Sequence, residues 1–205
     1  MFNKNQTYEQ HDNEKISFYR SSIDNLNSKD QLNSDINVDV CVIGGGLTGI
    51  SSALNLSKKG YSVVLCEARQ IGWGASGRNG GQLGIGMRKD QYTIEKKLGL
   101  NHAKELWNLG LESVDEVKNL IKEHNINCHI VNGVMSTACF AKDIDEYKFE
   151  IEHMSKNYNF EGYKFYNKDE IREEINSKMY LAGMLNLGSY HLNPLKLTIG
   201  LARVS

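Results

Sequence analysis

The sequence of 205 residues lacks several features that would place it in particular classes of protein. It has no apolar run long enough to span a bilayer, and its first fifteen residues lack the apolar core of a signal peptide. Its four cysteines form no C-x-x-C pair and no His/Cys cluster has zinc-ligand spacing, so no metal site is predicted. A formal net charge of -1 gives no electrostatic reason to expect nucleic acid or an anionic membrane as partner. These absences predict a cytoplasmic protein.

The composition of the chain is that of an ordinary globular domain, with 40% hydrophobic and 24% charged residues. The only proline is Pro194, whereas there are 19 glycines, unevenly distributed. Residues 1–36 are polar and without periodicity, which predicts an irregular N-terminal extension with Ser17-Phe18-Tyr19 as its only apolar anchor.

The segment after this extension has the pattern of a strand, a glycine loop, a helix and a second strand. Val38–Ile43 and Tyr61–Cys66 are apolar and β-branched, as buried strands are. Between them, Leu47, Ile50, Ala53 and Leu54 form one helical face, and Gly60 is a natural stop. The short crossover predicts a parallel pair of strands.

The glycine loop, GGGLTG, matches the G-x-G-x-x-G pattern of dinucleotide-binding domains. Gly44 would permit the tight turn, Gly46 would let a pyrophosphate approach the backbone, and Gly49 would let the helix pack closely on the strands. Glu67 ends the second strand, 21 residues after Gly46, where a carboxylate binds ribose hydroxyls and repels a 2′-phosphate. The pattern therefore favours NAD or FAD over NADP.

A second glycine-rich segment, residues 70–86, has seven glycines in seventeen positions. A packed helix or strand would not use so many, because each glycine loses backbone entropy when it is ordered. A nicotinamide dehydrogenase would normally continue into another strand–helix repeat, whereas this loop could run back along the cofactor. It therefore favours FAD.

The remaining chain alternates between helical and extended patterns. Helices are predicted from about residue 90 to 121 and over 144–158 and 169–175. Strands are predicted over 126–130, 134–139 and 163–166, with Asn132-Gly133 as a tight hairpin turn between the first two. Residues 179–190 are predicted to be extended, and Asn193-Pro194 begins a last helix that would run to Ser205.

The sequence VDVCVIGGGLTGISSALNLSKKGYSVVLCEA, followed by IGWGASGRNGGQ, resembles the FAD-dependent amine and amino-acid oxidases of the D-amino-acid oxidase superfamily. The GASGRNGGQ form is most similar to the gamma-glutamylputrescine oxidase branch. A weaker match, GSYHLNPLKLTIGLAR, resembles the family's return segment into the FAD domain. The implied fold is α/β: a Rossmann-like FAD-binding unit, residues 37–89 plus 186–205, with an inserted α+β portion of a substrate domain, residues 90–185.

The resemblance also implies which residues contact the cofactor. The pyrophosphate, adenosine ribose and ribitol would be held at the two glycine loops, and the second loop would run toward the flavin ring. The implied contacts are Gly44, Gly46, Leu47, Thr48, Gly49, Glu67, Ala68, Arg69, Gly74, Ala75, Ser76, Arg78, Asn79, Gly80, Gly81 and Gln82. Some relatives carry a histidine at the position of Arg78 that binds the flavin covalently, so the resemblance implies noncovalent FAD here.

The activity that the resemblance implies is oxidation of the C–N bond of an amine or amino acid to an imine, with oxygen as acceptor. The alternatives are a noncatalytic dinucleotide-binding module and an NAD-dependent dehydrogenase. Family members are considerably longer, so we expect an N-terminal fragment, incomplete at the C-terminus, that alone binds FAD poorly and is inactive. The sequence leaves the particular amine and the oligomeric state open.

Four further features have two interpretations each. His191 could line a substrate cavity or only begin a helix. Arg78 could face the flavin or a substrate carboxylate, or bond loop carbonyls. Trp73 could pack on the cofactor or in the core. Tyr163, Phe165 and Tyr166 could form a sheet face or an amine-binding cage.

Overall fold

The computed structural model describes residues 17–23 and 31–204, so most of the predicted N-terminal extension lies outside the described residues. Within these ranges the secondary-structure elements follow one another along the chain. They are α1 (Phe18–Ser21), β1 (Val40–Ile43), α2 (Leu47–Lys58), β2 (Val63–Cys66), a 3-10 turn (Ala75–Gly77), β3 (Gln82–Leu83), α3 (Gln91–Leu98), α4 (Leu100–Glu123), β4 (Val131–Ala138), α5 (Ala141–Tyr158), β5 (Tyr163–Tyr166), α6 (Lys168–Glu174), β6 (Ala182–His191) and α7 (Pro194–Ala202).

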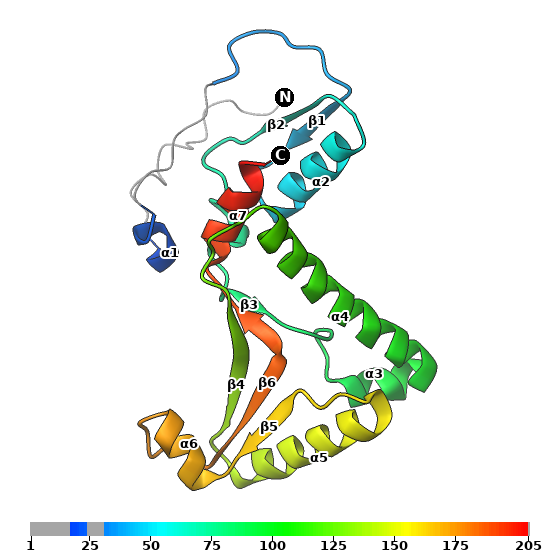
Figure 1. The fold of residues 1–205 in the computed structure, drawn as a ribbon, viewed down its shortest axis with the longest axis vertical. Coiled ribbons are helices and arrows are strands. Elements are labelled where there is room, and N and C mark those ends of the chain that lie inside the picture. The colour runs from blue at the N-terminus through cyan, green and yellow to red at the C-terminus, as the bar shows by residue number, and fades with distance from the viewer. Residues whose placement is uncertain (1–16, 24–30, 205) are drawn as a thin grey trace, which may run out of the picture.

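The predicted strand–helix–strand unit is present as β1, α2 and β2. The two strands pair in parallel, from Val40 opposite Val63 to Ile43 opposite Cys66. Both begin two residues later than predicted, because the residues before them are tied to each other instead: Asp39 accepts hydrogen bonds from the backbone and the hydroxyl of Ser62. The helix buries its predicted face. Figure 1 shows this unit at one end of the molecule, with α7 beside α2.

The larger sheet is antiparallel and has β6 at its centre. Strands β3, β4 and β5 all pair with β6: β4 pairs along most of its length, β3 at its C-terminal end and β5 nearer its N-terminal end. Figure 1 shows α4 running from the β1–α2–β2 unit toward α3 and α5, with the antiparallel sheet on the other side of the molecule. The chain enters this sheet at β3, directly after the second glycine loop, and returns along β6 into α7.

The predicted strand over 126–130 and the hairpin at Asn132-Gly133 are wrong. Strand β4 runs straight through the Asn-Gly pair, and its register against β6 shifts between Asn132 and Val134 around Gly133, whose φ is 96°. At this bulge Gly133 alone opposes residues 187–189 of β6, so the extra residues lie in β6. The segment before it is not a strand because its backbone bends at His129, with φ 54°, and the carbonyl of Cys128 accepts a hydrogen bond from the N–H of Asn193.

The predicted start of α7 is confirmed, whereas its predicted end is wrong. Asn193 caps the helix as predicted, its side chain accepting a hydrogen bond from the backbone of Lys196 at 3.0 Å, with Pro194 as the first helical residue. The helix ends at Ala202, however, rather than running to Ser205.

The buried core of the molecule joins α2 to α7. Its side chains come from segments far apart in the sequence: Ile50, Leu54, Ile121, Cys128, Leu192, Leu197 and Leu201. Within residues 17–23 and 31–204, no helix is long and apolar enough to cross a membrane, and no group of His, Cys, Asp and Glu side chains is arranged to hold a metal ion.

Candidate cofactor site

The first glycine loop connects β1 to α2, and each of its three motif positions requires a glycine for a different structural reason. Gly44 has a φ of 108°, which side chains rarely adopt. A Cβ atom on Gly49 would collide with the carbonyl oxygen of Gly44, so this glycine allows the helix to approach the strand. A Cβ atom on Gly46 would lie 2.9 Å from the hydroxyl of Ser76. Gly46 is the N-cap of α2, so its bare backbone stands at the start of the helix.

The carboxylate of Glu67 lies against this loop. One oxygen accepts a hydrogen bond of 2.6 Å from the N–H of Gly45, and the other accepts one of 2.9 Å from the N–H of Arg69. A Cβ atom on Gly45 would meet the side chains of Ile71 and Glu67. The middle glycine of the GGG run therefore also needs to be a glycine, a role that the spacing of the G-x-G-x-x-G motif does not reveal.

The second glycine loop is joined directly to the first. The N–H of Gly72 donates to the carbonyl of Gly45 at 2.9 Å, and the hydroxyl of Ser76 accepts from the N–H of Leu47 at 2.9 Å. Thr198, fully buried in α7, packs beside Gly72 and places its hydroxyl 3.4 Å from the carbonyl of Ser76. Both loops and α7 thus form one structure, and Thr198 was not singled out by the sequence because nothing in its local pattern indicates a loop partner.

Trp73 and Arg78 contact each other at the outer side of the second loop. The Arg78 guanidinium lies 4.7 Å from the centre of the indole ring and donates to the Trp73 carbonyl at 2.7 Å. The guanidinium of Arg69 also lies over this ring, at 5.3 Å. The structure therefore places Arg78 on a loop carbonyl, one of its two interpretations, and gives Trp73 two cationic neighbours.

The end of the second loop is organised by Asn79. Its amide donates to the carbonyls of Ala75 and Ser76, and its oxygen accepts from the N–H of Gly81. Gly81 has a φ of 69° and packs against the carbonyl of Leu192. In contrast, Cβ atoms on Gly74 and Gly80 would meet nothing within 4 Å. The side chains of Thr48 and Ala68 are exposed.

Gln82 and His191 are opposite each other in the β3–β6 pair. His191 is exposed, and its Nδ1 atom lies 3.1 Å from the carbonyl of Gly133. The antiparallel sheet thus begins where the second glycine loop ends. The predicted site residues therefore fall in two places: most lie in the two joined glycine loops, whereas Gln82 and His191 are paired at one end of the antiparallel sheet.

The start of α2 has the properties that a dinucleotide pyrophosphate requires. The first N–H groups of a helix have no partner within the helix, and the helix dipole favours negative charge there by about 0.3–1 kcal/mol. The bare face of Gly46 lets an anion approach these groups, and Ser76 adds a hydroxyl beside them. The residues present therefore fit an ADP-containing cofactor.

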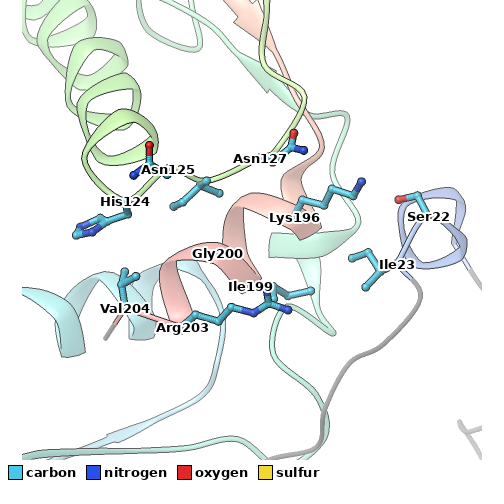
Figure 2. A pocket seen from close by; sticks show the side chains of 11 residues that line it. Ser22, Ile23, His124, Asn125, Asn127, Lys196, Ile199, Gly200, Arg203 and Val204 are labelled. Atoms are coloured by element: carbon cyan, nitrogen blue, oxygen red, sulfur yellow. The ribbon is translucent and has the colours of Figure 1, made fainter.

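A cavity of about 610 Å³ lies elsewhere, between α7, the end of α4 and the residues after α1. Figure 2 shows that its polar side chains do not all converge on one point: His124 lies on one side of α7, whereas Lys196 and Ser22 lie on the other. The ammonium of Lys196 contacts His129 at 2.9 Å. None of the predicted cofactor residues lines this cavity, so it is not part of the candidate site.

Comparison with known proteins decides the family. The FAD dependent oxidoreductase family, DAO, matches residues 39–204, which is most of the chain. The chain belongs to the DAO family of FAD-dependent oxidoreductases. Both glycine loops, the antiparallel sheet and α7 fall within the matched range, and the family's cofactor, FAD, is the one that the second glycine loop predicted.

Three similar proteins illustrate the relationship. The chain is 37% identical over 184 residues to gamma-glutamylputrescine oxidoreductase from Escherichia coli (strain K12), covering 90% of this chain and 43% of the relative. It is 35% identical over 166 residues to the probable oxidoreductase OrdL from Haemophilus influenzae, covering 80% and 38%. The structure of glycine oxidase from Bacillus cereus ATCC 14579 superimposes with a TM-score of 0.59 at 19% identity, over 82% of this chain and 43% of that one. The chain therefore spans about two fifths of the length of these proteins.

Proposed function

We propose that this protein oxidises the C–N bond of an amine or amino acid to an imine, with a substrate similar to gamma-glutamylputrescine and with oxygen as the electron acceptor. The observation that supports this most is the 37% identity to a relative named gamma-glutamylputrescine oxidoreductase, which extends over 90% of the chain. The likeness covers both glycine loops and the antiparallel sheet rather than the glycine motif alone. The substrate class is therefore argued from the whole chain and not from the cofactor motif.

In this proposal the cofactor lies at the start of α2. The N–H groups of the first helical turn and the bare face of Gly46 bind the pyrophosphate. Ser76 accepts a hydrogen bond from Leu47, which leaves its own hydroxyl hydrogen to donate to a phosphate oxygen. The two hydrogen bonds that Glu67 accepts hold its carboxylate in place, and the remaining lone pairs of its oxygens can accept the ribose hydroxyls.

The remaining predicted contacts are proposed as supporting ones. Arg78 has no nucleophilic atom with which to bind the flavin covalently, which supports noncovalent FAD. Asn79 fixes the turn of the loop, so Gly80 and Gly81 can present backbone rather than side chains to the cofactor. Gln82 and His191, paired at the end of the sheet where β3 meets β6, are proposed to face the space between cofactor and substrate.

The chemistry that bound FAD supplies is acceptance of a hydride from the carbon next to the amine nitrogen. The amine must be unprotonated, because its lone pair forms the C=N bond as the hydride leaves. Water then hydrolyses the imine to a carbonyl compound and an amine, and oxygen receives the two electrons as hydrogen peroxide. The protein's part is to bind the substrate with this carbon oriented toward the cofactor and to exclude its protonated form.

The proposal is tested on two purified proteins: the chain itself and the product of the reading frame that encodes it. Flavin absorbance and peroxide release are recorded for each. Gamma-glutamylputrescine is the substrate tested, with sarcosine, glycine and a D-amino acid as comparisons. Flavin bound in stoichiometric amount with peroxide released only on addition of an amine supports the proposal. Flavin bound without any amine-dependent turnover supports a noncatalytic dinucleotide-binding module instead, and retention of NAD in place of flavin would reject FAD as the cofactor.

A further inference from the structure

A second cavity, called here the sheet cavity, lies between α5 and one face of the antiparallel sheet and has a volume of about 240 Å³. Figure 1 shows α5 running alongside β5 at this end of the molecule. The face is set by the register, which places Val134 and Tyr163 opposite Asn186, and Ser136 opposite Met184. Because directly opposite residues of paired strands share a face, these five side chains form one wall of the cavity.

Glu150 of α5 is the one carboxylate in this cavity's wall. Its Oε1 atom accepts a hydrogen bond of 3.0 Å from the hydroxyl of Tyr163, a neutral group. In the part of the chain that the structure describes, no Lys, Arg or His side chain forms an ion pair with Glu150. A half-buried carboxylate with only a tyrosine as partner has unused capacity to bind a cation.

The surroundings of Glu150 are otherwise neutral or acidic. Burial raises the pKa of the Glu150 carboxyl, the nearby Asp90 raises it further, and the hydrogen bond from Tyr163 lowers it. The same carboxyl also borders a neighbouring cavity that contains Asp90, Glu146 and His153. His153 is bonded to Glu95 at 2.6 Å, so it is already occupied by another carboxylate. A positively charged ligand would therefore be attracted to Glu150 and would meet no competing cation from these neighbours.

The other walls of the sheet cavity suit the hydrocarbon part of such a ligand. Val134 and Met184 are apolar, and Ser136 and Asn186 add polar groups beside them. Asn186 uses its oxygen to accept a hydrogen bond from the N–H of Gly188, so its amide nitrogen is the group that can donate to a ligand. The volume is below the 300–1,000 Å³ typical of pockets that enclose a whole ligand, so it fits one end of a longer molecule.

The sheet cavity is connected to the cofactor loops by a single stretch of chain. Gln82, which lines the cavity, ends the loop whose earlier residues Gly72 and Ser76 bond to the first glycine loop. Gly84 lines the cavity as well. One part of the cavity wall is thus the continuation of the second glycine loop into β3.

We propose that the sheet cavity binds the ammonium group of an amine ligand, with Glu150 as its counter-ion. Resting on the proposed function, this specifies the substrate class. The amine that is oxidised must be unprotonated, so the ammonium at Glu150 is a second nitrogen of the same molecule. The substrate is then a diamine, or an aminoacyl derivative of one, that carries a cationic group several bonds from the oxidised carbon.

The test compares putrescine, which carries ammonium groups at neutral pH, with 1,4-butanediol, which has the same chain length and no charge. Binding to the purified chain is measured by calorimetry and by tyrosine difference absorbance, because a cation at Glu150 changes the hydrogen bond from Tyr163. We expect putrescine to bind about tenfold more tightly than 1,4-butanediol, a difference of about 1.4 kcal/mol. Equal binding of the two compounds, or no binding of putrescine, would overturn the proposal.

Two variants locate the site. Glu150→Gln keeps the shape and removes the charge, and we expect it to abolish the preference for putrescine, whereas Glu152→Gln, an exposed position on the same helix, should retain it. Ser136→Leu fills the cavity from an exposed position of β4 without altering Glu150, so it tests the location even where Glu150→Gln does not fold. We expect it to weaken putrescine binding at least about fivefold, and an unchanged affinity would overturn the proposal.

The test of the ammonium site and the test of the proposed oxidase activity can succeed or fail independently. Amine-dependent peroxide release with equal binding of putrescine and 1,4-butanediol would reject the ammonium site and keep the oxidase. A putrescine preference that depends on Glu150, in a protein that releases no peroxide, would keep the ammonium site and reject the oxidase.

Discussion

The hydroxyl of Ser76 accepts a hydrogen bond of 2.9 Å from the backbone N–H of Leu47, the first residue of α2. A serine usually caps the helix that it immediately precedes, but here the N-cap is Gly46, which has no side chain. The cap is supplied instead by the second glycine loop, 29 residues further along the chain. Gly46 can thus leave room for the cofactor while one of the free N–H groups of α2 is still bonded.

The first prediction concerns the separate roles of Gly46, which leaves room for the cofactor, and Ser76, which caps α2. Gly46→Ala places a Cβ atom 2.9 Å from the Ser76 hydroxyl and also in the space proposed for the pyrophosphate. We expect FAD affinity to fall at least about tenfold, measured by flavin fluorescence titration. Adding Ser76→Ala relieves the crowding at the cost of the cap, about 0.5–2 kcal/mol. The double variant should therefore still bind FAD weakly, and recovery of full affinity would contradict the role given to Gly46.

The second prediction concerns the packing of α2 on β1. Gly49→Ala brings a Cβ atom into the carbonyl of Gly44, and neither backbone can move without separating helix and strand. We expect the free energy of unfolding to fall by about 1–3 kcal/mol. The loss is expected even though alanine has a higher intrinsic helix propensity than glycine. The measurement is urea unfolding followed by circular dichroism. Gly80→Ala is the matched control, since nothing lies within 4 Å of its Cβ position, and its effect should stay within about 0.5 kcal/mol.

The third prediction concerns acid pH. Asp90 caps α3, and its carboxylate accepts hydrogen bonds of 2.8 Å from the N–H and from the hydroxyl of Thr93. The backbone hydrogen bond and then the side-chain hydrogen bond hold the pKa of Asp90 below its usual value. A lowered pKa in the folded state means that this carboxylate stabilises the fold above the unfolded-state pKa of about 3.9, and that the contribution is lost as the pH falls through the folded-state value.

The measurement for Asp90 is the urea midpoint between pH 7 and pH 3. Asp90→Asn can still cap the helix but does not titrate, so its stability should fall less steeply below about pH 4 than that of the parent chain. Asp90→Ala should lower stability by about 0.5–2 kcal/mol at pH 7. Parallel curves for the parent chain and Asp90→Asn would show that the cap contributes nothing to the acid response.

Local patterns were enough to predict the β1–α2–β2 unit, the parallel pairing and the cap at Asn193. Each of these depends on residues close together in the sequence: the apolar and β-branched composition of the strands, the glycines that the backbone needs, and the Asn-Pro pair. FAD as the cofactor, which the family membership confirms, followed from the spacing of Glu67 and the density of glycine after it. Short-range geometry decides these features, so a sequence displays them directly.

The Asn132-Gly133 pair shows where local patterns fail. The pair favours a hairpin turn by its conformational preference, but a hairpin also needs a strand on each side. Residues 126–130 do not supply one, because Cys128 bonds to Asn193 at the start of α7. Strand β4 takes its partner from β6 instead, and the positive φ of Gly133 is used for a bulge.

The sequence by itself thus determined the glycine loop, the elements on either side of it and the class of cofactor. The tertiary structure alone decided that Ser76 caps α2, that Thr198 lies beside Gly72, and that Arg78 bonds to the Trp73 carbonyl. It alone also brought Glu150 of α5 to Tyr163 of β5 beside the polar face of the sheet. The physical reason is that the contacts of Ser76 with Leu47 and of Thr198 with Gly72 join segments far apart in the chain, and the packing of those segments depends on the core as a whole. The other two contacts are closer in sequence, but they too depend on how their side chains pack in the folded structure.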